Sequence, residues 1–271
     1  MDELARYNKE RWEELARENV PYSRPFFDLD ERSARTHVDP HGMMGNIAGK
    51  DVLCLAGGGG QQSVALALLG GKVTVLDLTD TQLERDRMAA AHYDVSVVTV
   101  QGDMRDLSCF AADAFDIVWQ PYSINFVPDA RLVFRQVARV LRPDGIYRVA
   151  WANPFTQAVD DTAWNGKAYP LQHPYVDGYD ISELFPNWDF ETGDGTRKHI
   201  RGPREFRHNL STMLNGLIQL GFVLLGVREE TSFEPQPEPG TWEHFKSVAA
   251  PYLTIWATYR PYVFQDIALP A

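Results

Sequence analysis

DVLCLAGGGGQQS, residues 51–63, is the stretch of sequence that decides the fold. Its first five residues are mostly apolar and typical of a buried strand, and four consecutive glycines follow at 57–60. The residues after the glycines, QQSVALALLG, carry a helical pattern. Glycines let a backbone approach a bulky ligand closely, and the N–H groups that open the next helix favour a carboxylate or phosphate. The stretch therefore predicts a strand, a ligand-binding turn and a helix.

The alternation of strand and helix continues through residues 50–152. Further strands are expected at 72–78, 95–100, 115–120 and 146–152, with helices at 81–92 and 130–142. The pattern returns later with a helix at 210–220, a strand at 222–230, a helix at 242–249 and a strand at 252–260. Such alternation is the signature of βαβ units, so the predicted fold class is a doubly wound, Rossmann-like α/β sheet that is mostly parallel.

Residues 153–204 interrupt this alternation and are rich in Pro, Gly, Tyr, Trp and Asp. A loop of this length inside a compact domain is uncommon unless it serves a function. We therefore expect three parts: an N-terminal helical cover (1–49), a ligand-binding domain (50–152 and 205–271) and a substrate lid inserted at 153–204. Within the lid, Trp164 and Tyr175 are candidate substrate contacts through cation–π interactions, and the alternative is that these rings pack on one another.

Two acids stand at the ends of successive predicted strands. Asp77 lies at the tip of the second strand, where an acid can accept hydrogen bonds from both hydroxyls of a ribose. Asp103 follows the third strand in the sequence QGDM and can accept a hydrogen bond from an adenine amino group. Either acid could instead simply cap a helix or a turn. Their joint position after neighbouring strands favours a nucleotide site at this edge of the sheet.

A glycine turn with a downstream acid also fits an NAD(P)-binding oxidoreductase, which is one alternative function. The dinucleotide fingerprint G-x-G-x-x-G requires a third glycine. Gln62 occupies that place when the motif is counted from Gly57, and Ser63 occupies it when the count starts at Gly58. The glycine spacing therefore disfavours the oxidoreductase.

Taken together, these motifs resemble the class I S-adenosylmethionine-dependent methyltransferases over roughly residues 50–153. The family's first motif usually reads like VLDLGCGTG and stands here as VLCLAGGGG, so Cys54 replaces an acid and Ala56 replaces a glycine. The missing carboxylate often helps to organise that loop. The sequences VTVLDL, VQGDM, FDIVWQ and RVLRPDGIYRV match the family's later motifs. The chain also resembles a bacterial branch of small-molecule methyltransferases whose acceptors are unassigned.

The resemblance implies a seven-stranded sheet with an antiparallel last strand and S-adenosylmethionine bound at the carboxyl ends of strands one to four. It implies that the methionine part lies against the glycine turn, the ribose on Asp77 and the adenine on Asp103. Tyr122, after the fourth strand, is expected beside the acceptor. The expected cofactor contacts are Trp12, Ala56, Gly57, Gly58, Gly59, Gly60, Asp77, Leu78, Asp103, Met104 and Gln120.

Methyl transfer from a sulfonium is an in-line displacement that needs alignment and a dry pocket more than a nucleophilic residue. An oxygen or a protonated nitrogen acceptor also needs a base, and His173 and His208, in or beside the lid, are the candidates. We therefore expect an enzyme that methylates a small molecule. Because the first motif is altered, a non-catalytic S-adenosylmethionine-binding module is the other alternative.

Composition limits the classes of partner that the protein is expected to bind. Among 271 residues, 44% are hydrophobic and the net charge is −11, which repels nucleic-acid backbones and anionic lipids, so no nucleic-acid or membrane partner is expected. Cys54 and Cys109 lie far apart, which suits a reducing, cytoplasmic location. The histidines and cysteines lack metal-ligand spacing, so no metal is expected. The oligomeric state is left open.

Overall fold

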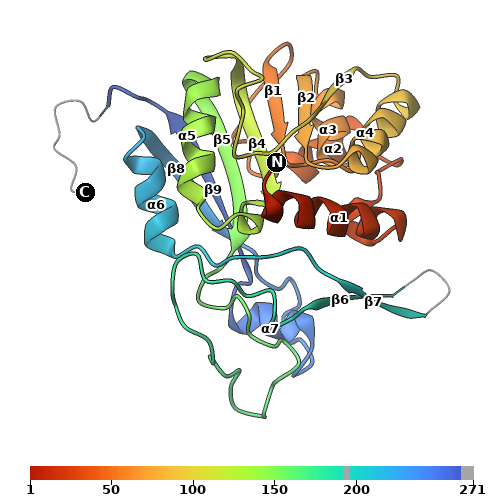
Figure 1. Ribbon diagram of the computed structural model, residues 1–271, viewed down its shortest axis with the longest axis vertical. Helices are drawn as coiled ribbons and strands as arrows, with labels where there is room; N and C mark the ends of the chain where they lie inside the picture. Colours follow the sequence, from red (N-terminus) through yellow and green to blue (C-terminus); the bar gives the residue numbers. More distant parts are fainter. Residues whose placement is uncertain (192–195, 264–271) are drawn as a thin grey trace.

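The computed structural model describes residues 1–191 and 196–263. Its centre is a seven-stranded sheet with the order β3-β2-β1-β4-β5-β9-β8 (Figure 1). The strands of this sheet are β1 (Asp51–Leu55), β2 (Lys72–Asp77), β3 (Val97–Gln101), β4 (Phe115–Tyr122), β5 (Leu141–Ala152), β8 (Phe222–Glu229) and β9 (Tyr252–Tyr259).

Strand directions confirm the predicted fold class. The pairs β1–β2, β1–β4, β2–β3 and β4–β5 are parallel. The last strand, β9, is antiparallel to both of its neighbours, β5 and β8. Parallel neighbours need a crossover segment between them, which is why helices separate these strands in the sequence. The result is a doubly wound, mostly parallel sheet with an antiparallel last strand, as expected.

Helices cover both faces of the sheet (Figure 1). Apolar side chains of α5 and α6 pack with Val118 and Tyr147 on one face, and those of α2 and α3 pack with Cys54 and Trp119 on the other. Burying one such apolar side chain contributes about 1.5–3 kcal/mol. The helices are α1 (Glu3–Arg17), α2 (Glu31–Val38), α3 (Gln62–Leu68), α4 (Asp80–His92), α5 (Ala130–Val140), α6 (Leu210–Ile218) and α7 (Trp242–Val248), with short 3₁₀ turns η1 (Pro21–Ser23) and η2 (Ile124–Phe126).

The predicted boundary between α5 and β5 is wrong. The helix expected to run to residue 142 ends at Val140, and β5 begins at Leu141 rather than at residue 146. Leu141 pairs with Phe115 of β4, and the register shifts before the next pair, Ile117 with Ile146. Asp144 has a positive φ of 63° inside the shifted stretch. The turn signal in the sequence therefore marks an irregularity within a strand instead of a loop before it.

Segment 153–204 is mostly irregular, and its ordered part is a hairpin of β6 (Asn187–Glu191) and β7 (Arg197–Arg201). Phe190 and Ile200 of this hairpin pack with Leu15 of α1 and Val20. The hairpin therefore packs on α1 and on Val20, which follows that helix. Along the described ranges, no helix is both long and apolar enough to span a bilayer. The division into cover, domain and lid remains a prediction.

Candidate functional site

A cavity of about 1070 Å³ lies at the carboxyl ends of the parallel strands. Figure 1 shows α1 lying across this edge of the sheet, with segment 153–204 beyond it. Ligands of doubly wound sheets bind at this edge on general topological grounds. Of the predicted cofactor contacts, the structure brings to the cavity wall Trp12, Ala56, Gly57, Gly58, Asp77, Leu78, Asp103 and Met104.

The turn after β1 lets its backbone lie close to Asp77 at the end of β2. Ala56 takes a left-handed φ of 50°, and the backbone then passes directly beside the end of β2. A Cβ atom on Gly58 would lie 2.9 Å from Cγ of Asp77 and 2.8 Å from Cβ of Gln82. A side chain at this position would therefore push the turn away from Asp77.

Asp77 holds the turn through its carboxylate. Its Oδ2 accepts a hydrogen bond from the backbone N–H of Gly58 at 3.0 Å, and its Oδ1 accepts from the N–H and hydroxyl of Thr79 at 2.9 and 3.0 Å. Burial raises the pKa of Asp77, and these hydrogen bonds oppose the rise. Since each oxygen can accept two hydrogen bonds, Oδ2 keeps capacity for one more donor from the cavity.

The second half of the glycine block faces away from the cavity. The N–H groups of Gly59 and Gly60 donate to Oδ2 and Oδ1 of Asp86 at 3.1 and 3.0 Å, and the hydroxyl of Ser63 also donates to Oδ1. Asp86 belongs to α4 and is fully buried, and burial raises its pKa to about 7. This carboxylate organises the turn that follows Cys54, where the family's usual acid is absent.

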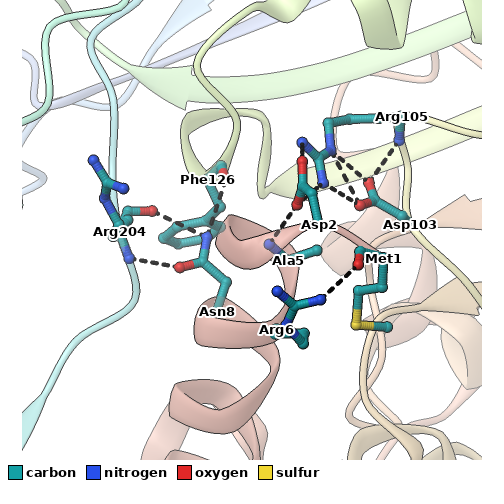
Figure 2. Close-up of polar contacts among 9 residues, drawn as sticks. All are labelled: Met1, Asp2, Ala5, Arg6, Asn8, Asp103, Arg105, Phe126 and Arg204. Atoms are coloured by element: carbon teal, nitrogen blue, oxygen red, sulfur yellow. Dashed lines mark hydrogen bonds and ion pairs between the residues drawn. The ribbon is translucent and has the colours of Figure 1, made fainter.

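Asp103 belongs to a chain of ion pairs with the start of α1 (Figure 2). Its carboxylate accepts hydrogen bonds from the Arg105 side chain at 2.6–3.1 Å, and Arg105 also pairs with the carboxylate of Asp2 at 2.8 and 2.9 Å. Asp103 therefore reaches the cavity wall with its oxygens already held in place. The same arginine fixes the first turn of α1 against the loop after β3.

Asn8 anchors the middle of α1 to two distant segments (Figure 2). Its Nδ2 donates to the carbonyl oxygens of Phe126 and Arg204 at 3.1 and 3.3 Å, and its Oδ1 accepts from the N–H of Arg204 at 2.7 Å. Trp12, one turn further along, packs edge-on against Phe126 and Trp188. These contacts place the predicted Trp12 over the cavity.

Gln120 lies behind the cavity wall rather than on it. Its Nε2 donates to the hydroxyl of Ser123 and to the sulfur of Met104, and its Oε1 accepts from the hydroxyl of Tyr147. Its side chain is fully buried among these partners. The structure therefore shows Gln120 supporting two wall residues, Ser123 and Met104, and its predicted direct contact with the cofactor receives no support.

Tyr122 does line the cavity, where it meets the half-buried carboxylate of Glu205. Its hydroxyl donates to Oε1 of Glu205, which also accepts from Nε2 of Gln157 at 3.2 Å. Burial raises the pKa of Glu205, and the two hydrogen bonds oppose the rise. Burial also raises the pKa of Tyr122, which keeps the phenol protonated as a donor. The buried Oε1 of Gln157 has no hydrogen-bond partner in the described part of the chain.

Besides Gly59, Gly60 and Gln120, four predicted residues lie outside the cavity lining. His208 is fully buried and its Nε2 contacts the carbonyl oxygen of Ile124, whereas His173 is half-buried in segment 153–204. Trp164 packs against Tyr169 and His244, and Tyr175 stacks on Phe155. The structure therefore brings neither histidine to the cavity wall. These aromatic rings follow the alternative in which they pack on their neighbours.

Sequence reasoning missed four groups at this site: Asp86, Arg148, Gln157 and Glu205. The sequence does mark Asp86 and Arg148, because each is a charged residue within an apolar pattern. Asp86 interrupts the apolar face that Leu83 and Ala90 share on α4, and Arg148 interrupts the apolar run of a central strand. Glu205 follows an aperiodic stretch, so no local pattern marks it.

Charge at the cavity wall is mainly negative, which suits a cationic sulfonium ligand. The acids on the wall are Asp77, Asp103, Asp161, Asp189, Glu205, Glu229 and Glu230, and the arginines are Arg105, Arg148 and Arg228. In the parts that the structure describes, no group of three or more His, Cys, Asp or Glu side chains is arranged to hold a metal ion. The arrangement can hold an adenosyl group at one end and accept a proton at the other.

Comparison with known proteins agrees with this geometry. A family described as "Methyltransferase domain" matches residues 53–149. The uncharacterized methyltransferase YbaJ of Bacillus subtilis is 34% identical over 186 residues, which cover 68% of this chain and 70% of that protein. The 27-O-demethylrifamycin SV methyltransferase of Amycolatopsis mediterranei is 34% identical over 120 residues, which cover 43% of this chain and only 44% of that protein.

Among solved structures, an S-adenosylmethionine-dependent methyltransferase from Mesorhizobium loti matches with a TM-score of 0.58 at 23% identity. The match covers 86% of this chain and 100% of that one. At this level of identity the likeness concerns the fold.

Proposed function

This chain belongs to the class I S-adenosylmethionine-dependent methyltransferases, and we propose that it methylates a small molecule held between Tyr122, Glu205 and segment 153–204. One observation carries this proposal: a single cavity joins the strand-tip acids to the half-buried carboxylate of Glu205, which accepts hydrogen bonds from Tyr122 and Gln157. The matched family and relatives are methyltransferases, and nothing in them supports the nicotinamide oxidoreductase or the non-catalytic module.

In this proposal the strand tips hold the cofactor. Ala56, Gly57 and Gly58 would hold the methionine part, and Leu78 and Met104, which also line the cavity, would contact the adenosyl group. Asp77 accepts a ribose hydroxyl through the free capacity of Oδ2. Asp103, whose carboxylate is held by Arg105, lies beside the adenine amino group. Trp12 covers the bound cofactor from α1. Gln120, Gly59 and Gly60 act from behind the wall.

The acceptor end is built from hydrogen-bond acceptors. In the described residues only Oε1 of Glu205 receives hydrogen bonds, so Oε2 remains available, and Oε1 of Gln157 is buried without a partner. A buried acceptor atom without a donor costs about 1–3 kcal/mol, which a ligand that brings N–H or O–H groups removes. We therefore propose an acceptor that carries a hydroxyl or amino group.

The chemistry follows from this placement. When bound, the cofactor supplies a methyl group on a positively charged sulfur. Tyr122 fixes the carboxylate of Glu205, which accepts the hydrogen bond of the acceptor O–H or N–H. As the new bond to carbon forms and the bond from sulfur to carbon breaks, the proton moves to Glu205, whose raised pKa suits a base. Glu205 thus replaces His173 and His208 as the proposed base.

Two supporting points concern substrate class and location. The relative from Amycolatopsis mediterranei is named for methylation of a rifamycin, a small molecule, which supports a small-molecule acceptor here. Cys54 and Cys109 are both free thiols, which supports the proposed cytoplasmic location.

Methyl transfer can be tested with S-adenosylmethionine labelled in its methyl group and the small-molecule fraction of a cell extract. We expect the wild type to label a small molecule, and Glu205→Gln to slow labelling about 100-fold while binding S-adenosylhomocysteine within about threefold of wild type. Glu229→Gln, an exposed acid at the same cavity, is the matched control and should keep both properties. Undiminished labelling by Glu205→Gln would contradict the role of Glu205.

A further inference from the structure

Arg148 of β5 presents a guanidinium group to the cavity without a carboxylate partner. Its Nη1 donates to the backbone oxygen of Gln120 at 2.7 Å, and the guanidinium lies over the ring of Trp119 with 4.0 Å between Cζ and the ring centroid. Across residues 1–191 and 196–263, no acid forms an ion pair with it. Arg105, at the same cavity, has two such partners.

The groups around Arg148 do not supply a negative charge. Burial raises the pKa of the Cys54 thiol well above its usual value, and burial lowers the pKa of His37, with the nearby guanidinium adding to that effect. Both groups are therefore neutral near pH 7. Burial also lowers the pKa of Arg148, to about 10, so the guanidinium itself remains charged. Arg148 is half-buried on the cavity wall, and a guanidinium there without a paired acid attracts an anion into the cavity.

The sheet places this charge close to the glycine turn. Trp119 of β4 pairs with Cys54 of β1 on one side and with Arg148 of β5 on the other, so these three residues share one face of the sheet. Because the guanidinium is stacked on Trp119, it lies above β4, and neighbouring strands are only about 4.8 Å apart. A Cβ on Gly57 would lie 2.6 Å from the sulfur of Cys54 and 3.3 Å from Pro121, so the turn begins beside this stack.

We propose that Arg148 is the binding group for a carboxylate in this cavity. The carboxylate at the amino-acid end of the cofactor is the source that the position favours, because the same turn is the proposed contact of the methionine part. An acidic group on the acceptor is the other source of the same chemistry. This inference rests on the proposed function and adds to it the residue that neutralises the bound acid.

The test compares two ligands that differ by one group. S-Adenosylhomocysteine carries the carboxylate, and its decarboxylated form, S-adenosyl-3-thiopropylamine, lacks it. Isothermal titration should show that Arg148→Met binds S-adenosylhomocysteine at least about tenfold more weakly than wild type, with less than about threefold change for the decarboxylated ligand. Arg228→Met removes another arginine of the same cavity and should change neither affinity by more than about threefold.

Each other outcome has a defined meaning. If Arg148→Met leaves both affinities unchanged but abolishes binding of benzoate to the protein saturated with S-adenosylhomocysteine, the carboxylate belongs to the acceptor. If all three ligands bind Arg148→Met as they bind wild type, the inference is overturned. Failure of the wild type to bind S-adenosylhomocysteine would instead reject the proposed function.

Arg148→Lys provides a second variant in case Arg148→Met does not fold. It keeps the positive charge and loses the flat group that stacks on Trp119. The affinity for S-adenosylhomocysteine should fall by less than in Arg148→Met, and the ratio between the two ligands should stay above one. Equal binding of the two ligands by wild-type protein would exclude the cofactor as the source of the carboxylate and leave the acceptor as its source.

Discussion

The two ends of the cavity are built in different ways. At the strand tips, backbone N–H groups of Gly58, Gly59 and Gly60 bind carboxylates that lie within 30 residues along the chain. At the acceptor end, Tyr122 and Gln157 meet Glu205 across separations of 83 and 48 residues. In the proposed function, cofactor binding therefore depends on local sequence, whereas acceptor binding depends on how a long irregular segment packs. Changes at one end should leave the other largely intact.

The largest expected effect tests the strand-tip end. In Gly58→Ala the new Cβ would lie within 3 Å of Gln82 and Asp77, so the turn must move away from the end of β2. We expect the affinity for S-adenosylhomocysteine to fall about 100-fold, as measured by isothermal titration. Gly226→Ala, whose Cβ would approach nothing closer than 3.8 Å, is the matched control. Equal affinities in the two variants would mean that the cavity ligand does not depend on the turn.

A somewhat smaller effect is expected at Asp77. Asp77→Ala removes the carboxylate that holds Gly58 and the proposed ribose acceptor, which should weaken S-adenosylhomocysteine binding about 30-fold. Asp80→Asn changes an exposed acid three residues away and should bind normally. If Asp77→Ala binds as tightly as wild type, the ribose assignment is wrong.

This contrast also explains what the sequence could reveal. Asp77 and Asp103 were predicted because each lies at or just after the end of a strand, and strand order fixes where such residues lie. Asp86 was missed because its role depends on α4 packing against the turn. Glu205 was missed because its neighbours in the sequence say nothing about Tyr122. Conversely, residue type made His208 a candidate base, but packing places it beside Ile124, away from the cavity.

The buried Asp86 predicts a dependence of stability on pH. Its folded pKa of about 7 is above the unfolded value of 3.8, so the folded state favours the protonated form. The stabilisation is complete below about pH 4 and is lost as the pH rises through about 7. Urea unfolding should therefore show that the free energy of unfolding of the wild type falls between pH 5 and pH 8 by about 2 kcal/mol more than that of Asp86→Asn.

Asp77 is the charged neighbour of Asp86 and is present in both proteins, so the difference between them isolates Asp86. Asp80→Asn again serves as the control and should follow the wild-type curve. Parallel curves for wild type and Asp86→Asn would show that Asp86 has the same pKa in the folded and unfolded states.

The smallest expected effect concerns Asn8, which joins α1 to the segments of Phe126 and Arg204. Asn8→Ala leaves polar groups of Phe126 and Arg204 without partners and should lower the free energy of unfolding by about 1 kcal/mol. Arg6→Ala, on the same helix, loses only an exposed contact with Met1 and is the control. Thermal unfolding measures both. If Arg6→Ala lost as much stability as Asn8→Ala, the hydrogen bonds of Asn8 would contribute no more to stability than an exposed contact does.

A crystal structure of the protein with S-adenosylhomocysteine tests the central claim most directly. The account predicts density for one molecule along the strand tips, with its ribose on Asp77, its adenine beside Asp103 and its sulfur directed toward Tyr122 and Glu205. Density elsewhere, or a strand edge that stays empty at saturating ligand, would contradict it.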